Sequence, residues 1–200
     1  MIAVTSTFTA SPSSNILSFE GIEGVGKSTQ INLLKDWLNN KGLSTVLFRE
    51  PGSTEAGEKI RELLLSNELN LSNESELLLM FAARAQLVSE KINNNEDDVI
   101  LFDRYYDASI AYQGHGRSLS LDLIKNLIQF TNCPEPNLTI LLDLDVEEGF
   151  KRKSGDVIDR IESSGIEFFN RVREGYKQIA KSQPNRVKLI AVSYTHLTLP

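Results

Sequence analysis

The chain has 200 residues and a net charge of −6, because 21 lysines and arginines face 27 aspartates and glutamates. This acidic balance argues against a broad surface for nucleic acid or an anionic membrane, so any phosphate site has to be a local cluster of cations. No apolar run approaches the ~18 residues of a membrane-spanning helix. Cys133 is the only cysteine, which excludes a disulfide within the chain. We therefore expect a globular domain with a substantial core in a reducing compartment, the cytoplasm.

Residues 15–191 are expected to form this single domain, and the stretches before and after it differ in composition. Residues 1–14 are rich in Ser and Thr and lack Lys and Arg. They match a secretory signal poorly, and we expect a disordered or non-native lead-in. Residues 192–200, VSYTHLTLP, resemble a translated sequencing-library adapter, which predicts a non-native tail. The alternative is a genuine β-rich tail, since Tyr, Thr and Leu suit a strand.

The most specific feature is the run Gly21–Ser28, GIEGVGKS, a complete G-x-x-x-x-G-K-[ST] phosphate loop. The apolar run Ile16–Phe19 before it predicts a buried strand, and a helix is expected to begin near Lys27. Main-chain N–H groups of the tight turn can point at phosphate oxygens, Lys27 can reach the β- and γ-phosphates, and Ser28 can bind Mg²⁺. The alternative is a glycine-rich turn with an exposed lysine. The residues expected to bind ATP are Gly21, Ile22, Glu23, Gly24, Val25, Gly26, Lys27, Ser28 and Thr29.

Strand-like and helical runs alternate along the rest of the chain. The further expected strands are Ser44–Phe48, Val99–Phe102, Leu138–Leu142 and Val187–Ala191. The expected helices are Ser28–Asn39, Ala56–Leu65, Ser75–Ile92, Leu119–Phe130, one starting at Glu147–Lys151, and Ile166–Lys181. One face of the Ser75–Ile92 helix is expected to hold Leu78, Phe81, Ala82, Ala85 and Val88–Ser89. The alternation predicts an α/β fold, with a parallel sheet of about five strands flanked by helices on both faces.

Three candidate sites follow strands of this sheet. The phosphate loop follows the first strand, the sequence REPG at residues 49–52 follows the second, and DRY at residues 103–105 ends the third. Ligands of parallel sheets bind at the carboxyl ends of the strands. We therefore expect these three sequences to meet at one edge.

The chain resembles the thymidylate kinase (dTMP kinase) family, of bacterial type, from residue 16 to about residue 190. The matching stretches are FEGIEGVGKST, FREPGST, LLLMFAARAQLV, DRYYDASIAYQG, PNLTILLDLDVEEG and DRIESSGIEFFNRVREGY. The resemblance implies a P-loop NTPase-like sheet with nucleoside monophosphate kinase architecture. It also implies Mg²⁺-dependent transfer of the ATP γ-phosphate to dTMP, giving dTDP for dTTP biosynthesis, and a homodimer.

Acidic and basic residues at the strand ends are candidates for the acceptor site. Arg49 and Arg104 can each grip a phosphate through a planar guanidinium, or can be halves of ion pairs with Glu50 and Asp103. Both can hold, because a carboxylate often fixes a phosphate-binding arginine. By resemblance, Asp103 holds a Mg²⁺-bound water and Glu23 accepts a hydrogen bond from the sugar 3′-hydroxyl of dTMP. A solvated loop carboxylate is the alternative for Glu23.

Four further residues are expected at the nucleoside. Phe81 and Arg84 lie one turn apart on a helix and can reach the same patch. By resemblance, Phe81 stacks on thymine and Arg84 hydrogen-bonds its edge, although periodicity alone favours a core aromatic at Phe81. Tyr112 and Gln113 are expected beside the sugar and base, with Tyr112 crowding the 2′ position. The expected dTMP-binding residues are Glu23, Arg49, Glu50, Phe81, Arg84, Arg104, Tyr112 and Gln113.

Basic residues around a glycine-containing segment, residues 151–162, predict a mobile lid. They are Lys151, Arg152, Lys153 and Arg160. The variable positions of the phosphate loop hold no arginine, and in the resembled family this goes with catalytic cations in the lid. The alternative is a solvated basic helix end. Arg152 and Arg160 are favoured because guanidinium geometry suits phosphoryl oxygens. The expected catalytic residues are Lys27, Arg104, Arg152 and Arg160, and the expected metal-binding residues are Ser28 and Asp103.

Two positions depart from the resembled pattern, which has glycine at both. His115 stands in QGHGR, where we expect a loop near the site, and Ser53 stands in EPGST. Two other functions stay open from the sequence. One is a different P-loop nucleoside or nucleotide kinase, and the other is a non-catalytic nucleotide-binding module.

Overall fold

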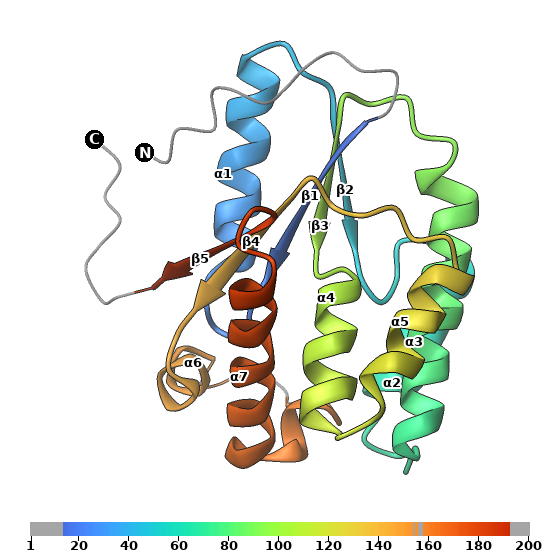
Figure 1. The fold of residues 1–200 in the computed structure, drawn as a ribbon, viewed down its shortest axis with the longest axis vertical. Coiled ribbons are helices and arrows are strands. Elements are labelled where there is room, and N and C mark those ends of the chain that lie inside the picture. Colours follow the sequence, from blue (N-terminus) through green and yellow to red (C-terminus); the bar gives the residue numbers. More distant parts are fainter. Residues whose placement is uncertain (1–13, 154, 156–157, 193–200) are drawn as a thin grey trace.

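The structure is a computed structural model that describes residues 14–153, 155 and 158–192 (Figure 1). Its centre is a five-stranded sheet in the order β2-β3-β1-β4-β5, with every neighbouring pair parallel. The strands are β1 (Asn15–Glu20), β2 (Thr45–Arg49), β3 (Val99–Asp103), β4 (Leu138–Asp143) and β5 (Val187–Ala191). The fold class predicted from the sequence is confirmed, and each predicted strand is present within one or two residues.

Helices connect the strands. They are α1 (Lys27–Asn40), α2 (Glu55–Leu65), α3 (Asn73–Leu87), α4 (Tyr106–Ser109), α5 (Leu121–Phe130), α6 (Val146–Arg152) and α7 (Ile166–Ser182). Two of them continue as π-helices, α3 into η1 (Val88–Ile92) and α4 into η2 (Ile110–Gly116), and η3 (Glu162–Ser164) is a short 3₁₀ turn. In the described part of the chain, no helix combines the length and the apolar character that crossing a bilayer requires.

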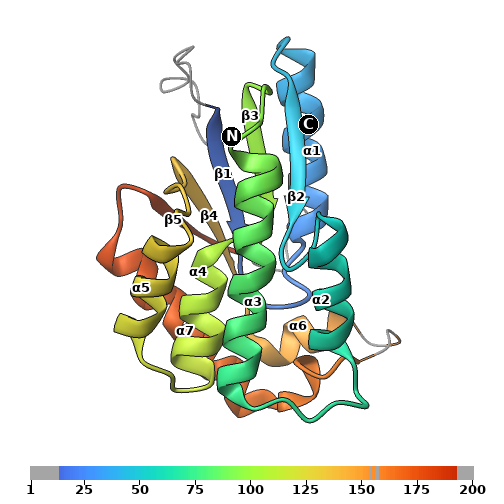
Figure 2. The ribbon, with the colours of Figure 1, turned by 90° about the vertical axis from the view of Figure 1, so that its right-hand side faces the viewer.

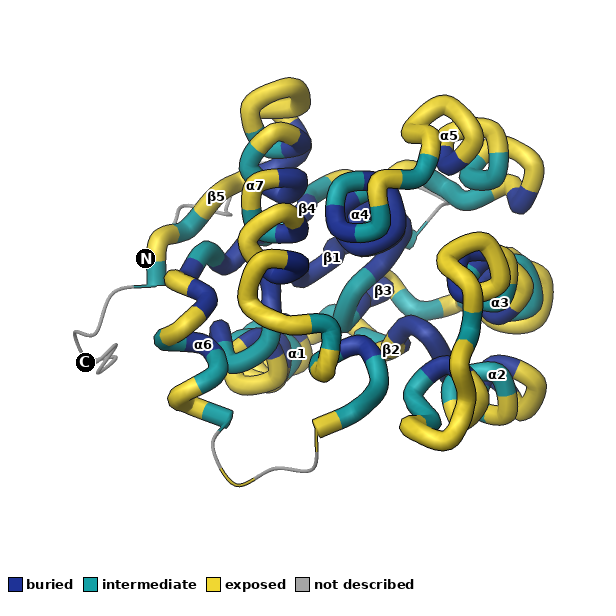
Figure 3. The backbone as a smooth tube through the Cα atoms, turned by 90° about the horizontal axis from the view of Figure 1, so that it is seen from below, coloured by how far each residue is buried: buried dark blue, intermediate teal, exposed yellow. Residues whose placement is uncertain are grey.

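The two faces of the sheet bury different helices. Leu17 and Phe19 of β1 pack with α1 on one face, whereas Ile16 packs toward α3, η1 and α4 on the other. This alternation follows from the two-residue period of a strand. Seen along the strands in Figure 3, α1 lies on one side of the sheet, and α3, α4, α5 and α7 lie on the other. The sheet is therefore covered on both faces, as parallel sheets usually are.

One predicted helix face is wrong in part. Phe81 and Val88 are buried as expected, but Leu78 and Ala82 are exposed. The buried face of α3 instead passes through Leu77 and Arg84. This face could not be predicted from hydrophobic periodicity, because a charged residue, Arg84, occupies one of its buried positions.

The helix formed by α4 and η2 was not predicted. Its residues are nearly all buried between α7 on one side and α3 and α5 on the other. The expected loop at His115 is wrong, because His115 lies in η2 with its ring against Gly175 of α7. A β-carbon at residue 175 would lie 2.7 Å from this ring, so the two segments are in close contact.

Candidate active site

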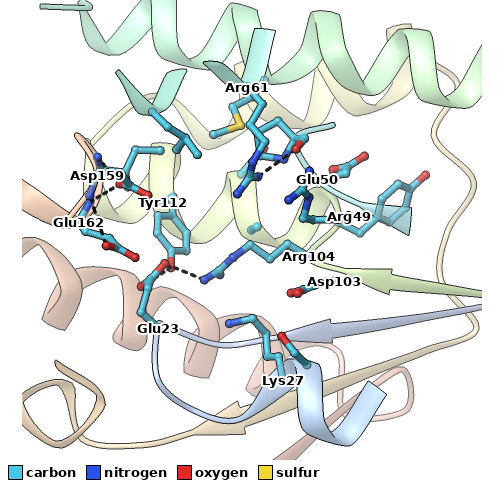
Figure 4. A pocket seen from close by; sticks show the side chains of 18 of the residues that line it. Glu23, Lys27, Arg49, Glu50, Arg61, Asp103, Arg104, Tyr112, Asp159 and Glu162 are labelled. Atoms are coloured by element: carbon cyan, nitrogen blue, oxygen red, sulfur yellow. Dashed lines mark hydrogen bonds and ion pairs between the residues drawn. The ribbon is translucent and has the colours of Figure 1, made fainter. Parts of the chain in front are cut away.

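An open cavity of about 460 Å³ lies at the carboxyl edge of the sheet (Figure 4). Its walls come from the phosphate loop, the ends of β2 and β3, helices α2 and α3, the α4–η2 helix, and the residues Arg152, Lys153, Asp159, Ile161 and Glu162. The three sequences GIEGVGKS, REPG and DRY do meet at this edge, as expected for parallel strands.

The phosphate loop leads into a helix whose N-terminus has no side-chain cap. Helix α1 begins after Gly26, which has φ of 89°, and its first turn contains no acidic residue. By contrast, Thr54 caps α2 and Ser72 caps α3 through their side chains. The uncapped N–H groups of α1 are thus left for an anion, and the helix dipole favours one there.

Lys27 lies inside the loop and contacts main-chain oxygens. Its Nζ donates to the carbonyls of Gly21, at 3.2 Å, and Ile22, at 2.9 Å. Burial, together with the nearby charge of Arg104, lowers the pKa of Lys27 to about 8. A phosphate group beside Lys27 would supply the opposite charge that favours the protonated amine.

Most, but not all, of the expected ATP-binding residues line the cavity. Those that do are Glu23, Gly24, Gly26, Lys27, Ser28 and Thr29. The side chains of Ile22 and Val25 are buried in the core that α7 shares with β4. Gly21 does not line the cavity either. Any contact of these three residues with ATP is therefore restricted to the main chain.

The tip of the phosphate loop packs tightly against α6. A β-carbon on Gly24 would lie 2.2 Å from the carbonyl oxygen of Gly149, and one on Gly149 would lie 2.6 Å from that of Glu23. Two glycines therefore allow the loop and the helix to touch backbone to backbone. The helix that carries Arg152 is thereby fixed to the loop expected to hold ATP.

Glu23, Arg104 and Tyr112 form one network across the cavity (Figure 4). Arg104 donates through Nη2 to Glu23 Oε1 and through Nη1 to the Gly21 carbonyl, both at 2.7 Å. The Tyr112 hydroxyl donates to both Glu23 oxygens at 3.0 Å. Burial and the Glu23 charge raise the pKa of Tyr112 well above its usual range, so the hydroxyl keeps its proton. The partner of Arg104 is thus Glu23, and not the expected Asp103.

Arg104 itself adopts an unusual backbone conformation. Its φ is 67°, a left-handed value that non-glycine residues rarely adopt. Such strain concentrates at functional sites. Arg104 directly follows β3, and Figure 4 shows its side chain between Lys27 of the phosphate loop and Arg49.

Arg49 is held by a different acid from the one expected. It donates through Nη2 to both oxygens of Glu58 on α2, at 2.9 and 2.8 Å, rather than to Glu50. Ser53, which stands where the resembled family has glycine, has φ of 67°. Its hydroxyl accepts the Arg49 N–H at 2.8 Å, and its own N–H donates to Glu58 at 2.7 Å. These hydrogen bonds offset the strain that a non-glycine residue brings to this turn.

Glu50 pairs with Arg84 in the interior of the cavity wall. Arg84 contacts Glu50 Oε2 through Nη2 at 2.6 Å and donates through Nη1 to the Ser109 hydroxyl at 3.0 Å. Burial raises the pKa of Glu50 against the opposing charge of Arg84. The second oxygen, Oε1, is buried without a hydrogen-bond partner among the described residues. Glu50 and Arg84 both line the cavity, so a ligand can reach this pair.

Phe81 does not line the cavity. Its ring is buried with Leu77 and Ile124, under the guanidinium of Arg84 at 4.6 Å. The core position that the helical periodicity favours for Phe81 is therefore confirmed in this structure, and its stacking on the acceptor base stays a prediction. Met80, one residue earlier and one turn before Arg84, lines the cavity instead.

Arg61 also lines the cavity, although it was not predicted as a site residue from the sequence. Its Nη1 donates to the Pro51 carbonyl at 3.0 Å, and burial and the neighbouring Arg49 lower its pKa. A signal was available, because Arg61 lies four residues after Gly57 and three before Leu64, both buried on α2. Figure 4 shows Arg49, Arg61 and Arg104 around the same space.

The two arginines favoured in the lid occupy different places. Arg152, at the end of α6, and Lys153 line the cavity, and Lys153 pairs with Glu162. Arg160 does not line this cavity. It donates to the Leu64 carbonyl at 2.8 Å and to Glu76 Oε2 at 2.9 Å. The buried carboxylate of Glu76 thus holds the Arg160 guanidinium outside the cavity, and the catalytic role expected for Arg160 stays a prediction. Residues 154, 156 and 157 of the expected lid lie outside the described residues.

Ser28 and Asp103 both line the cavity, as expected of metal-binding residues. Among the described residues, no cluster of three or more His, Cys, Asp or Glu side chains could hold a metal ion. Mg²⁺ in phosphotransferases is usually bound by one or two protein oxygens, by phosphates and by water. A hydroxyl and a carboxylate beside the phosphate loop fit that donor set.

Comparisons with known proteins point to one family. The sequence model of the family described as thymidylate kinase matches residues 19–196. A thymidylate kinase of Kosmotoga olearia is 45% identical over 178 residues, which cover 87% of this chain and 86% of that protein. One from Vesicomyosocius okutanii is 47% identical over 184 residues, 90% of each chain.

A solved structure gives the same result. The crystal structure of thymidylate kinase from Ehrlichia chaffeensis aligns with a TM-score of 0.73 at 31% identity, covering 93% of this chain and 92% of that one. The similarity thus extends over nearly the whole length of both chains. By sequence and by fold, this chain belongs to the thymidylate kinase family.

Proposed function

We propose that the protein transfers the γ-phosphate of ATP to dTMP, forming dTDP and ADP. The observation that carries the proposal is a single cavity in which an uncapped phosphate loop faces Arg49, Arg61, Arg84 and Arg104. Phosphoryl transfer depends mainly on positioning and charge neutralisation, with donor and acceptor oxygens in line. Phosphate acceptors are already ionised, so the reaction needs no base in the cavity.

On the donor side, the N–H groups of the loop and the Lys27 ammonium bind the β- and γ-phosphates. Lys27 exchanges its carbonyl partners, Gly21 and Ile22, for phosphate oxygens when ATP binds. Arg152 at the end of α6 approaches the transferred phosphoryl group, where a cation can raise the rate by about 10³–10⁵.

On the acceptor side, Arg49, Arg61 and Arg104 bind the dTMP phosphate. Glu23 accepts the sugar 3′-hydroxyl, and the Tyr112 ring crowds the 2′ position. The base lies against Met80, with Arg84 donating to its edge. Each role rests on a residue that lines the cavity.

Mg²⁺ would be held by the Ser28 hydroxyl and by Asp103, directly or through water. When bound, the ion neutralises charge on the phosphate oxygens.

We also propose a cytoplasmic homodimer. The support is that three helices carry large exposed apolar side chains: Leu63 on α2, Leu78 on α3, and Leu123 and Phe130 on α5. These helices lie side by side on one face of the molecule (Figure 2). An exposed apolar patch is typical of an interface.

A coupled assay of ADP release tests the reaction with dTMP, dCMP, dGMP and thymidine as acceptors. We expect dTMP to give the highest kcat/KM, with activity that requires Mg²⁺. Faster turnover of another acceptor would reject the acceptor assignment. ATP binding without transfer to any acceptor would indicate a non-catalytic module.

A further inference from the structure

Glu76 is a buried carboxylate outside the cavity whose position the proposed chemistry does not explain. It lies in the first turn of α3, two turns before Arg84, and is fully buried. Burying a carboxylate is costly unless charged and hydrogen-bonding partners compensate. The partners of Glu76 therefore have to compensate for the burial of its charge.

Both oxygens of Glu76 are saturated. Oε1 accepts from Gln113 Nε2 at 2.9 Å and from Arg117 Nε at 3.3 Å. Oε2 accepts from Arg117 Nη2 at 3.1 Å and from Arg160 Nη2 at 2.9 Å. Burial alone would raise the pKa of Glu76, but the hydrogen bonds from Arg117 and Gln113 hold it below its usual range. The group is therefore an ionised carboxylate that can only accept hydrogen bonds.

This has a consequence for Gln113, which lines the cavity from η2. An amide has a donor end and an acceptor end, which usually can exchange by a flip of the side chain. Here a flip would place the Gln113 carbonyl oxygen against an ionised carboxylate, and the two acceptors would repel. Glu76 thus holds Nε2, and Oε1 is left as the acceptor end of the side chain.

Arg84 supplies the complementary group. It lies on the same helix as Glu76, lines the cavity, and can only donate. Together, Arg84 and Gln113 offer one donor and one acceptor to the edge of a base. A ring with a carbonyl next to an N–H fits this pair, whereas a ring with an amino group next to an unprotonated nitrogen presents the opposite pattern.

We propose that Glu76 is a positioning residue for base selection, which fixes the Gln113 amide so that its oxygen accepts the ring N–H of a thymine-type base. The inference rests on the proposed function and deepens it. Glu76 acts through Gln113 and does not touch the substrate. Its ion pairs with Arg117 and Arg160 keep it ionised and so keep the amide from flipping.

The test is Glu76→Gln, which preserves shape but offers Gln113 both a donor and an acceptor. The two acceptors compared are dTMP and 5-methyl-dCMP, whose bases differ only in the hydrogen-bonding edge. We expect the ratio of their kcat/KM values to fall about tenfold, the effect of one reversed hydrogen bond. Glu74→Gln, an exposed acid on the same turn, is the matched control and should leave the ratio unchanged.

A purely structural role gives a different result. Glu76→Gln would then lower kcat/KM for both acceptors by the same factor, and the unchanged ratio would overturn the proposal. In a Gln113→Leu background, Glu76→Gln should produce no further change in the ratio. A fall as large as in the wild-type background would show that Glu76 does not act through Gln113.

The test also covers a variant that does not fold and a wild type that is inactive. If Glu76→Gln does not fold, Glu76→Asp retains the charge beside Arg117 but retracts from Gln113, and the same fall in the ratio is expected. If the wild type transfers phosphate to neither acceptor, the proposed function fails. Calorimetric affinities for the two nucleotides then replace kcat/KM and test the inference separately.

Discussion

At the phosphate loop, Lys27 is the cation proposed to bind the phosphates of ATP. Its ammonium is buried against two carbonyls and has no carboxylate bonded to it in the described structure. We predict that Lys27→Ala lowers kcat by about 10²-fold or more, as loss of a preorganised charge contact does. Binding of dTMP, measured by calorimetry without ATP, should change little. An equal loss of dTMP affinity would mean that Lys27 serves the acceptor.

Glu20, the last residue of β1, should make stability depend on pH. It accepts from the Tyr105 N–H and the Tyr176 hydroxyl, both at 2.7 Å, while burial and the charge of Asp107 raise its pKa to about 8. The folded state therefore keeps a proton that the unfolded state releases above its ordinary pKa of 4.5. The contribution of Glu20 to stability is full below that value and is lost as the pH rises toward 8.

Glu20→Gln should remove this dependence. We expect the melting temperature of the variant, relative to the wild type, to increase between about pH 5 and pH 8. Thermal melts at several pH values provide the measurement. A constant difference across the range would mean that Glu20 is ionised throughout.

Substitutions of Met80 and Phe81 should have different effects, one on substrate binding and the other on stability. Met80→Ala is expected to raise the KM for dTMP severalfold with a small change in melting temperature, because Met80 lines the cavity. Phe81→Ala should instead cost about 3–5 kcal/mol of unfolding free energy, the usual cost of removing a core phenylalanine. Steady-state kinetics and denaturant unfolding of both variants give the comparison. A raised KM for Phe81→Ala alone would support stacking of Phe81 on the base.

The sequence predicted individual residues well where a motif assigns their chemistry. Lys27, Ser28, Asp103 and Arg104 all line the cavity. Met80 lines the cavity and Phe81 is buried, because one residue of helical rotation, about 100°, separates the two side chains. Partners could not be predicted, because ion pairs such as the one between Glu50 and Arg84 join residues far apart in the chain.

Among the elements, α6 and the phosphate loop depend on a glycine contact. We predict that Gly149→Ala lowers kcat/KM for ATP by about 10²-fold, because its methyl group would displace the loop at the Glu23 carbonyl. Glu147→Ala, an exposed position on the same helix, serves as the control. Unchanged kinetics for Gly149→Ala would mean that the loop or the helix moves at little cost.

The helices that were predicted from the sequence are those that bury one face and expose the other. Helix α7 shows a clear apolar face, with Phe168, Val172 and Tyr176 buried, and was predicted within a residue or two. The α4–η2 helix has no exposed face, because other helices surround it, so its sequence lacks the periodicity that reveals a helix. Its two glycines, Gly114 and Gly116, also suggested a loop.

For the whole molecule, the exposed apolar side chains on α2, α3 and α5 carry the proposed dimer. We predict that Leu78→Glu converts a dimer to a monomer, because Leu78 is 59% exposed on α3, which lies between α2 and α5 in Figure 2. Leu33→Glu, on α1 across the sheet, is the matched control. Light scattering coupled to gel filtration measures both masses. A monomeric wild type, or a dimeric Leu78→Glu variant, would contradict this arrangement.

The overall fold was the most predictable level, since alternating strands and helices leave few possible topologies. The placement of the segment around Arg160 was not predictable. It depends on Glu76 and on the Leu64 carbonyl, which only the assembled structure brings near.

The order of the strands also sets the distance between two parts of the site. The donor loop extends from β1, and Arg104 extends from β3, its immediate neighbour in the ladder. Adjacent strands are spaced by ~4.8 Å, so a single inter-strand step separates the main chain from which the loop and Arg104 extend. In this ladder Asn15 pairs with Val99 and Phe19 pairs with Asp103, and in the proposed reaction this pairing sets the distance between the two nucleotide sites.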